Sequence, residues 1–402
     1  MSVSEEAEVI ASKASVILDL PPSCIQLSSN HPEYVIIGTY NLEKDQSQAS
    51  EGQEAGSKEV QSRNGSLVVF RAEDDTLVHV QTEPSASALL DLRFHPSADF
   101  PGLLAVVSST ATLSVFRLDP ESDLSSPLKH IATSRCDGVE EDVLFLQFQW
   151  HPVHPYVIGV TTSTGSVMLL QLNERWEIAK STSLDIENSL EAWCIAFSPQ
   201  PMPGTGGEDT ATSVVYAGGD DSKLRYNSYS GIDTLAADTE YAPQTVSGKH
   251  DAGVTAILPL DLHEPNGGRL VLTGSYDDTL RLFAIHDLDK SYGTKRVKPL
   301  VEQNLGGGVW RLDLVEAKSL DGGAAKIVLL ASCMYAGARL VEVRSTDGQE
   351  WSCKILARFE EHKSMIYGCT FRWDRQGGRR TLICLSTSFY DKLFCLWKVD
   401  VE

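Results

Sequence analysis

The stretch Leu146-Gln147-Phe148-Gln149-Trp150-His151-Pro152 decides the fold, together with the two short apolar runs that follow it, Tyr156–Val160 and Gly165–Leu169. Each run is only five to seven residues long, which suits a β-strand and is too short for an ordinary helix. The first run alternates apolar and polar residues and ends on an aromatic residue followed by His-Pro. The stretch therefore predicts three consecutive strands joined by turns.

This unit recurs along the whole chain. Residues that hold the place of Phe148 recur 49 to 60 residues apart, at Phe94, Phe148, Phe197, Ile257, Leu312 and Phe371. A degenerate first copy runs from Cys24 through Tyr34 to Phe70. Evenly spaced four-stranded units imply radial closure. The sequence therefore predicts an all-β protein, a single seven-bladed β-propeller over residues 1–402.

The last copy stops at its third strand, Phe394–Trp397, and its blade needs a fourth strand from elsewhere. The apolar segment Ser15–Leu20 is the expected closing strand, because it would join the two chain ends and cover free strand edges. Polar inserts rich in Gly or Pro account for the long repeat, at 41–64, 119–140, 200–211 and 285–300. We expect the insert 41–64 to be disordered.

The repeats contain only part of the WD-repeat signature. Only Trp397 holds the tryptophan position at the end of a third strand, and turn aspartates survive at Asp221, Asp277 and Asp391. His250 and His362 lie just before the first strands of blades five and seven. A His–Asp pair of this kind usually holds a blade together. The pairs His250–Asp277 and His362–Asp391 are therefore interpreted first as structural.

Composition narrows the partners. The net charge of −21 would repel phosphate backbones, so we expect no nucleic-acid partner and favour cationic ligands or basic surfaces. A role of the acidity in solubility alone stays open. No apolar run approaches the ~18 residues of a membrane helix, and the acidic N-terminus lacks the basic start of a signal peptide. We expect a cytosolic protein that does not bind membranes.

The motifs of several enzyme classes do not occur. The eight cysteines form no Cys-x-x-Cys pair, so we expect buried free thiols and no zinc site. The sequence has no Gly-x-Ser-x-Gly elbow, no Walker loop and no His-Glu-x-x-His. The run Gly306–Gly308 is too short to cradle a phosphate. No metal or cofactor is therefore expected.

Four segments are richer in functional side chains than a structural blade requires, and all lie just before a first strand or at the turn after a second strand. In a propeller these positions converge around one mouth of the central channel. The residues gathered there would be Glu191, Trp193, Trp310, Arg311, Tyr335, His362, Ser364, Tyr367, Tyr390 and Asp391. Acidic, basic and aromatic groups around one concavity suit a cationic ligand.

These same segments resemble a known family. The ordered set comprises Gly-Gly-Gly-Val-Trp-Arg at 306–311, Met-Tyr-x-Gly at 334–337, Ser-x-x-Tyr-Gly at 364–368 and Ser-Phe-Tyr-Asp at 388–391. Segments 191–193 and 218–225 also fit. Together they are similar to the diphthine methyl esterases, WD-repeat proteins of diphthamide synthesis. A departure is Tyr226-Asn227, where a tryptophan is usual.

The resemblance implies an activity and a partner. Members of this family hydrolyse the methyl ester of methylated diphthine on translation elongation factor 2, and a separate ligase then amidates the product. The substrate is a modified histidine with a trimethylammonium group, which an acidic, aromatic mouth would favour. The resemblance thus implies a carboxylic ester hydrolase that acts on elongation factor 2. We further expect it to act as a monomer.

Two catalytic routes are open. In the first, His362 is the base and either Ser364 or water attacks the ester. In the second, a carboxylate of Glu191, Asp220 or Asp391 activates water. The oxyanion candidates are Arg311, the Trp310 indole N–H and the amides near Gly307 and Gly308.

Substrate-binding candidates surround this centre. They are Trp193, Asp220, Trp310, Tyr335, Tyr367 and Tyr390. Structural alternatives stand beside these roles, because His362 and Asp391 could only pin blade seven, and Tyr367 could be a core aromatic. The rival function is a non-catalytic adaptor, for instance in ubiquitin ligation or endosomal recycling, because the fold is a general binding platform.

Overall fold

The computed structural model describes residues 7–42, 63–199, 212–320, 323–374 and 380–401. The predicted insert 200–211 lies outside the described residues, and so does most of the insert 41–64, whose predicted disorder is therefore not addressed. The described ends of the insert 41–64 are strands, since Asn41 pairs with Asn64 and Leu42 with Arg63.

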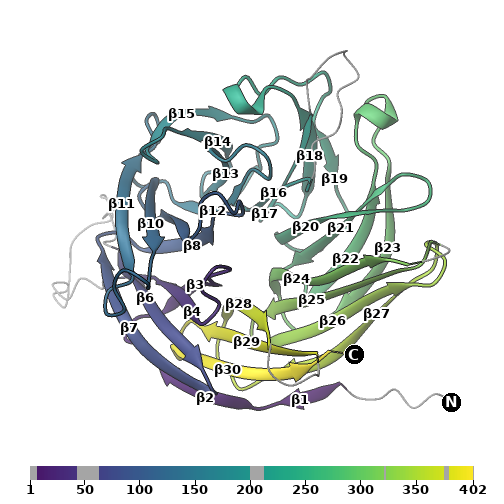
Figure 1. The fold of residues 1–402 in the computed structure, drawn as a ribbon. Helices are drawn as coiled ribbons and strands as arrows, with labels where there is room; N and C mark the ends of the chain where they lie inside the picture. The colour runs from purple at the N-terminus through teal and green to yellow at the C-terminus, as the bar shows by residue number, and fades with distance from the viewer. Residues whose placement is uncertain (1–6, 43–62, 200–211, 321–322, 375–379, 402) are drawn as a thin grey trace, which may run out of the picture.

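Seven blades, each built on four antiparallel strands, are arranged in a ring around a central axis (Figure 1). Blade one contains β3 (Pro22–Leu27), β4 (Tyr34–Thr39), β6 (Arg63–Glu73) and β7 (Thr76–Ser85), with the short β5 (Asn41–Leu42) beside β6. Blade two contains β8 (Leu89–Phe94), β9 (Leu103–Ser108), β10 (Thr112–Leu118) and β11 (Leu128–Arg135). Blade three contains β12 (Phe145–Trp150), β13 (Val157–Thr162), β14 (Val167–Leu172) and β15 (Ile178–Ser183).

The second half of the chain repeats this order. Blade four contains β16 (Ala192–Phe197), β17 (Ser213–Gly219), β18 (Leu224–Tyr229) and β19 (Gln244–Val246), with the 3₁₀ turn η1 (Ile232–Thr234). Blade five contains β20 (Val254–His263), β21 (Arg269–Ser275), β22 (Thr279–Ile285) and β23 (Val297–Asn304), with η2 (Asp289–Ser291). Blade six contains β24 (Val309–Ser319), β25 (Ala325–Cys333), β26 (Gly337–Ser345) and β27 (Trp351–Phe359). Blade seven contains β28 (Ile366–Trp373), β29 (Thr381–Ser388) and β30 (Leu393–Asp400).

The core is divided among the blade interfaces. The buried apolar residues form seven clusters in the described chain, one between each neighbouring pair of blades. Second strands such as β9 and β13 are buried along their whole length, because a neighbouring blade covers each of their faces. This double coverage explains why they appear in the sequence as unbroken runs of apolar and small residues. The predicted propeller is confirmed.

The outer strands were harder to predict. The segment 119–140 was expected to be an insert, and that expectation was wrong in part, because Leu128–Arg135 forms the outer strand β11. Most of the residues of β11 are exposed or half-buried. An outer strand that faces solvent has few apolar positions, so its sequence resembles a polar loop.

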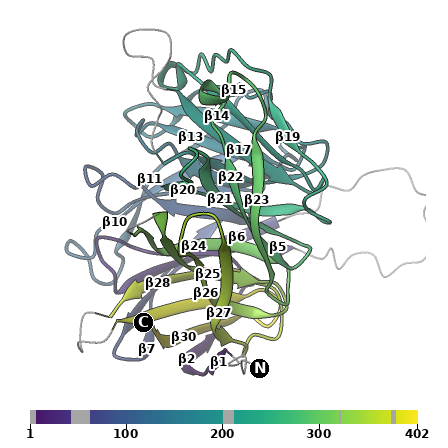
Figure 2. The same ribbon diagram turned by 90° about the vertical axis from the view of Figure 1, so that its right-hand side faces the viewer.

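Two N-terminal strands close the ring. β2 (Ser12–Ile17) pairs antiparallel with β30 and supplies the fourth strand of blade seven, three residues earlier than the predicted segment 15–20. β1 (Glu8–Ile10) pairs parallel with β27 and adds a fifth strand to blade six, which the sequence did not predict. Both ribbon views show β1 and β2 along the outer edge of these blades (Figure 1, Figure 2). At the start of β2, the backbone N–H and the hydroxyl of Ser12 donate hydrogen bonds to the Glu361 carboxylate, at 2.8 and 2.6 Å.

His250 and His362 stabilise blades five and seven by hydrogen bonds inside each blade. His362 is buried and its two ring nitrogens lie 2.7 Å from the hydroxyls of Ser386 and Ser388, while Trp397 donates to Ser386 at 3.1 Å. In blade five, His250 Nε2 lies 2.9 Å from the Thr273 hydroxyl. Both histidines therefore bond strand hydroxyls.

The turn aspartates have a separate structural task. Asp277 accepts the backbone N–H of Asp251, and Asp391 accepts that of Lys363, each at 2.9 Å. Each aspartate thus holds the residue that follows the histidine of its own blade. The histidines and aspartates stabilise the same blades, as expected, but through different partners.

We predict that these histidines make the fold sensitive to acid. Burial lowers the pKa of His362 to about 4, against 6.5 for a free histidine. Folding therefore favours the neutral ring, and its contribution is complete above pH 6.5 and is lost as the pH falls toward 4. Between pH 7 and pH 5, protonation of the unfolded chain should cost about 2 kcal/mol of stability per such histidine.

The measurement is urea unfolding at pH 7 and pH 5 for the wild type and for His362→Gln. The variant should be less stable at pH 7, but its additional loss at pH 5 should be smaller than that of the wild type by about 2 kcal/mol. An equal pH dependence in both proteins would show that the buried ring does not link folding to protonation.

Candidate functional site

A β-bulge near the start of every inner strand sets up the channel mouth. In each blade the register with the second strand skips the second residue of the first strand. The skipped residues are Ser23, Leu90, Leu146, Trp193, Thr255, Trp310 and Tyr367. A bulge leaves its extra residue unpaired and re-aims the side chain. The mouth is therefore aromatic at blades four, six and seven, and small or aliphatic elsewhere.

The re-aimed aromatic side chains meet across the mouth. Trp310 is the centre, with ring centroids 5.4 Å from Trp193, 5.0 Å from Tyr367 and 5.8 Å from Tyr276. Phe389 extends the group, 5.3 Å from Tyr367. Blades four and six are not neighbours, so the contact between Trp193 and Trp310 shows that these side chains converge on the mouth. We call Trp193, Tyr276, Trp310, Tyr367 and Phe389 the aromatic cluster.

Two carboxylates border the aromatic cluster on blade four. The Trp193 indole N–H donates to Asp220 Oδ1 at 2.5 Å, and the Asp220 backbone N–H donates to the Glu191 carbonyl at 3.0 Å. Burial raises the pKa of Asp220, and the charges of Glu191 and Asp221 add to this effect, while the hydrogen bond from Trp193 opposes it. A cation bound here would relieve the repulsion between the carboxylates. This border therefore favours a positively charged ligand.

Tyr276 and Phe389 were not predicted as site residues. Tyr276 directly precedes the turn aspartate Asp277, as Asp220 precedes Asp221 and Tyr390 precedes Asp391. The signal was therefore present, since the same turn position was recognised in blades four and seven. Phe389 lies one residue earlier in the turn of blade seven.

Two predicted tyrosines lie at the rim. Tyr335 is 69% exposed and Tyr390 is 67% exposed, so neither is packed into the aromatic cluster on both faces. Tyr390 contacts Phe389 at a centroid distance of 5.1 Å. Tyr335 adopts a positive φ of 61° in the turn after β25. Both side chains are therefore open to solvent at the rim.

The predicted serine–histidine arrangement is not formed. Ser364 donates to Asp391 Oδ1 at 2.5 Å and accepts the backbone N–H of Tyr390 at 2.9 Å. Both ring nitrogens of His362 are engaged by Ser386 and Ser388 instead. The structure therefore does not bring His362 to Ser364 as base to nucleophile, and it uses both residues, with Asp391, inside blade seven.

The glycines have a packing requirement of their own. A Cβ on Gly307 would lie 2.0 Å from the Met334 carbonyl oxygen, so only glycine fits there. Gly308 has more room, and its carbonyl accepts the Met334 N–H at 2.7 Å. Two other predicted oxyanion donors stay free of partners within the described residues, because Trp310 Nε1 and Arg311 Nη1 are buried without a hydrogen bond there.

Below the aromatic cluster, the channel holds a buried group of charges. The Arg311 guanidinium carbon lies 5.2 Å from the Trp310 ring centroid, and Arg311 Nη2 lies 3.9 Å from Asp91 Oδ1. Asp91 pairs with Arg93 at 3.1 Å. Burial raises the pKa of Asp313 to about 6. We call Asp91, Arg93, Arg311 and Asp313 the channel charge cluster.

Only Arg311 of this cluster was expected from the sequence. The signal for the others is their spacing, because Asp91 and Arg93 alternate on β8 as Arg311 and Asp313 alternate on β24. Alternate residues of an inner strand share one face, here the face that lines the channel.

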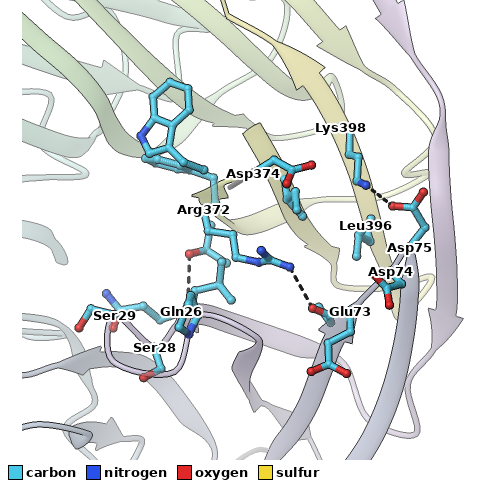
Figure 3. A pocket seen from close by; sticks show the side chains of 17 residues that line it. Gln26, Ser28, Ser29, Glu73, Asp74, Asp75, Arg372, Asp374, Leu396 and Lys398 are labelled. Carbon is cyan, nitrogen blue, oxygen red and sulfur yellow. Dashed lines mark hydrogen bonds and ion pairs between the residues drawn. The ribbon is translucent and has the colours of Figure 1, made fainter. Parts of the chain in front are cut away.

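A further cavity lies away from the mouth, between blades one and seven (Figure 3). Its volume is about 650 Å³, and it is reached by the far ends of β3 and β28 and by the hairpin turn after β6. Its cations are engaged within the chain, since Lys398 pairs with Asp75 at 2.5 Å and Arg372 donates to the Ala72 carbonyl at 3.1 Å. None of the predicted site residues lines it.

Two further properties concern the described residues as a whole. No group of three or more His, Cys, Asp or Glu side chains in them is arranged to hold a metal ion. No helix among them has the length and apolarity needed to cross a membrane. Seven cysteines are buried, Cys353 is half-buried, and all eight are free.

The chain is similar to known proteins in both fold and sequence. No family model matches the chain. In fold, it is similar to a chain of the mitotic checkpoint complex (TM-score 0.58, 12% identity, 99% of this chain and 95% of that chain) and to Saccharomyces cerevisiae Sqt1 (TM-score 0.57, 11% identity, 97% and 99%). In sequence, it is 26% identical over 396 residues to the Schizosaccharomyces pombe protein named diphthine methyltransferase, which covers 97% of this chain and 98% of the relative. The similarity extends over almost the whole length of both proteins and agrees with the family resemblance of the sequence motifs.

Proposed function

We propose that this protein hydrolyses the methyl ester of methylated diphthine on translation elongation factor 2, and so prepares the acid that is later amidated to diphthamide. The relationship to a protein named diphthine methyltransferase supports a role in diphthamide biosynthesis. Hydrolysis, rather than methyl transfer, and elongation factor 2 as the substrate are the parts that this proposal adds.

The observation that carries the proposal is the aromatic cluster with its acidic border. Methylated diphthine bears a trimethylammonium group, which is a permanent cation without a hydrogen-bond donor. Such a group is recognised by aromatic faces and by nearby negative charge. Trp193 and Tyr276 offer aromatic rings beside Asp220, and Glu191 lies next to them. Each good cation–π contact contributes about 1–2 kcal/mol when desolvated.

The candidate site also contains groups that suit ester hydrolysis. Ester hydrolysis needs an activated water molecule and a donor for the oxyanion. Because Ser364 and His362 are engaged within blade seven, the carboxylate route is the one that we retain. Arg311 supplies a cationic donor beside Trp310. The sequence of events thus needs no covalent intermediate.

A non-catalytic adaptor remains the rival function, since the propeller fold alone is a binding platform. An adaptor needs a surface patch but has no use for a buried channel charge cluster under an aromatic mouth. Two experiments separate these functions.

The first experiment concerns the cell. Elongation factor 2 from cells without this protein should carry methylated diphthine instead of diphthamide, because the ester blocks amidation. Mass spectrometry of the modified peptide measures this directly. Normal diphthamide in those cells would contradict the proposal and favour the adaptor.

The purified protein gives the chemical test. Incubated with elongation factor 2 that carries methylated diphthine, and with no methyl donor added, it should release one methanol per factor demethylated. Formation of the acid without methanol, or a requirement for a methyl acceptor other than water, would favour methyl transfer over hydrolysis.

A further prediction concerns substrate binding. Asp220→Asn keeps an oxygen for the Trp193 N–H but removes the charge, so KM for the modified factor should rise about tenfold, or ~1.4 kcal/mol, with kcat changed less than twofold. The matched control is Asp99→Asn, an exposed carboxylate in the loop between β8 and β9, which should leave KM unchanged. An unchanged KM in Asp220→Asn would remove the carboxylate border from cation recognition.

A further inference from the structure

We propose that Asp313 is the base that activates the hydrolytic water and that Arg311 holds the oxyanion, so that the reaction takes place in the channel charge cluster and not at the carboxylates of the mouth. This inference rests on the ester hydrolysis proposed above. It divides the site into two levels, with the cation held at the mouth and the ester below it.

The position of the channel charge cluster supports this division. Arg311 on β24 lies 3.9 Å from Asp91 on β8, so the contact joins blades six and two across the channel. Asp91 is held in place by Arg93 at 3.1 Å and by the Phe148 backbone N–H at 3.2 Å. The Arg93 guanidinium also donates to the Phe148 carbonyl at 2.6 Å. Arg311 is thus oriented by a partner that is itself fixed.

Two atoms of this cluster lack partners in the described part of the chain. They are Arg311 Nη1 and Asp313 Oδ2, both buried. A cavity of about 50 Å³ adjoins them and is lined by Asp91, Arg311, Asp313 and Tyr367, among others. One water molecule occupies about 30 Å³, so the cavity has room for the attacking water. Burying two polar atoms without hydrogen bonds costs stability, and a ligand that bonds both atoms would offset this cost.

Distances fit the chemistry of diphthine. The trimethylammonium group and the esterified carboxyl of diphthine are carried by one carbon, so they lie within a few ångströms of each other. Tyr367 belongs to the aromatic cluster and also lines the cavity. The Arg311 guanidinium lies 5.2 Å from the Trp310 ring centroid. A cation held by the aromatic cluster therefore brings its ester toward Arg311.

The electrostatics of Asp313 suit a base near neutral pH. Burial raises its pKa to about 6, Arg93 and Arg311 hold it down, and Asp91 raises it further. The thiols of Cys369 and Cys384 also face it, and burial raises their pKa so that they stay neutral. Asp313 is therefore ionised above pH 6 but basic enough to accept a proton, which is the range in which general bases work best.

Asp313 takes a proton from water while the water oxygen bonds to the ester carbon, and the carbonyl electrons move to the oxygen beside Arg311. The tetrahedral intermediate then expels methoxide, which receives the proton from Asp313 and leaves as methanol. The product carboxylic acid ionises and gives its proton to solvent. Ester and water are consumed, and carboxylate, methanol and one proton are formed.

The test compares Asp313→Asn with the wild type in the methanol-release assay on elongation factor 2 carrying methylated diphthine. We expect kcat to fall at least 100-fold with KM changed less than threefold, because a lost general base costs about 10²–10⁴-fold. Asp220→Asn should show the opposite split, a higher KM with nearly unchanged kcat. Asp99→Asn is again the control for both values.

A measurement on the wild type keeps the test independent of how the variant folds. Its kcat/KM should fall tenfold per pH unit below about pH 6, and Asp313→Glu should keep this dependence with partial activity. Methanol release by the wild type together with full kcat in Asp313→Asn, or a flat profile from pH 5 to 7.5, would overturn this inference alone. No methanol release by the wild type would instead overturn the proposed function on which it rests.

Discussion

The antiparallel pairing of β2 with β30 is the contact on which the rest of the molecule depends. Without it, blade seven would have three strands and an open edge. The pairing runs from Ser12 opposite Trp397 to Ile17 opposite Leu393. Since the parallel strand β1 extends the contact to blade six, one N-terminal segment ties together the two blades that carry Trp310 and Tyr367. The geometry of the mouth is thus a consequence of ring closure.

Within the closed ring, the candidate site is built on a repeated irregularity of the inner strands. Every inner strand has a bulge at its second residue, so every blade presents one side chain to the mouth. The backbone is nearly seven-fold, while the side chains are not. The bulged residue is a bulky aromatic in blades four, six and seven, whereas it is Leu90 in blade two and Leu146 in blade three. A common scaffold becomes a specific site by substitution at one position per repeat.

The buried charges divide into two kinds. His250 and His362 are neutral and hydrogen-bonded, so they stabilise their blades at moderate energetic cost. The channel charge cluster is different, because it places two arginines and two aspartates in a small cavity and leaves Arg311 Nη1 and Asp313 Oδ2 without partners in the described residues. A group of charges that is only partly satisfied destabilises a fold. Such a cost is typical of residues kept for binding or chemistry rather than for stability.

The architecture, and the gathering of the candidate site residues at one mouth, could be predicted from the repeat pattern alone. Apolar strands of fixed length, repeated seven times, can bury their side chains only by packing blade against blade, and this predicts the propeller. The same repeat placed Trp193, Trp310 and Tyr367 at one mouth, because equivalent positions in equivalent blades face the same way. The closing strand was predicted because the last repeat lacks a partner for its outer edge.

Which of those residues contact one another depends on the three-dimensional structure of the closed ring. His362 and Ser364 are two residues apart in sequence, yet their hydrogen bonds point to different partners, because the hydroxyls of Ser386 and Ser388 take both nitrogens of the ring. Asp91 and Arg311 are separated by 219 intervening residues and meet only because the ring closes. Local patterns specify which face of a strand a side chain occupies. The distance between side chains on opposite blades depends on the diameter and closure of the whole ring, and no local pattern encodes it.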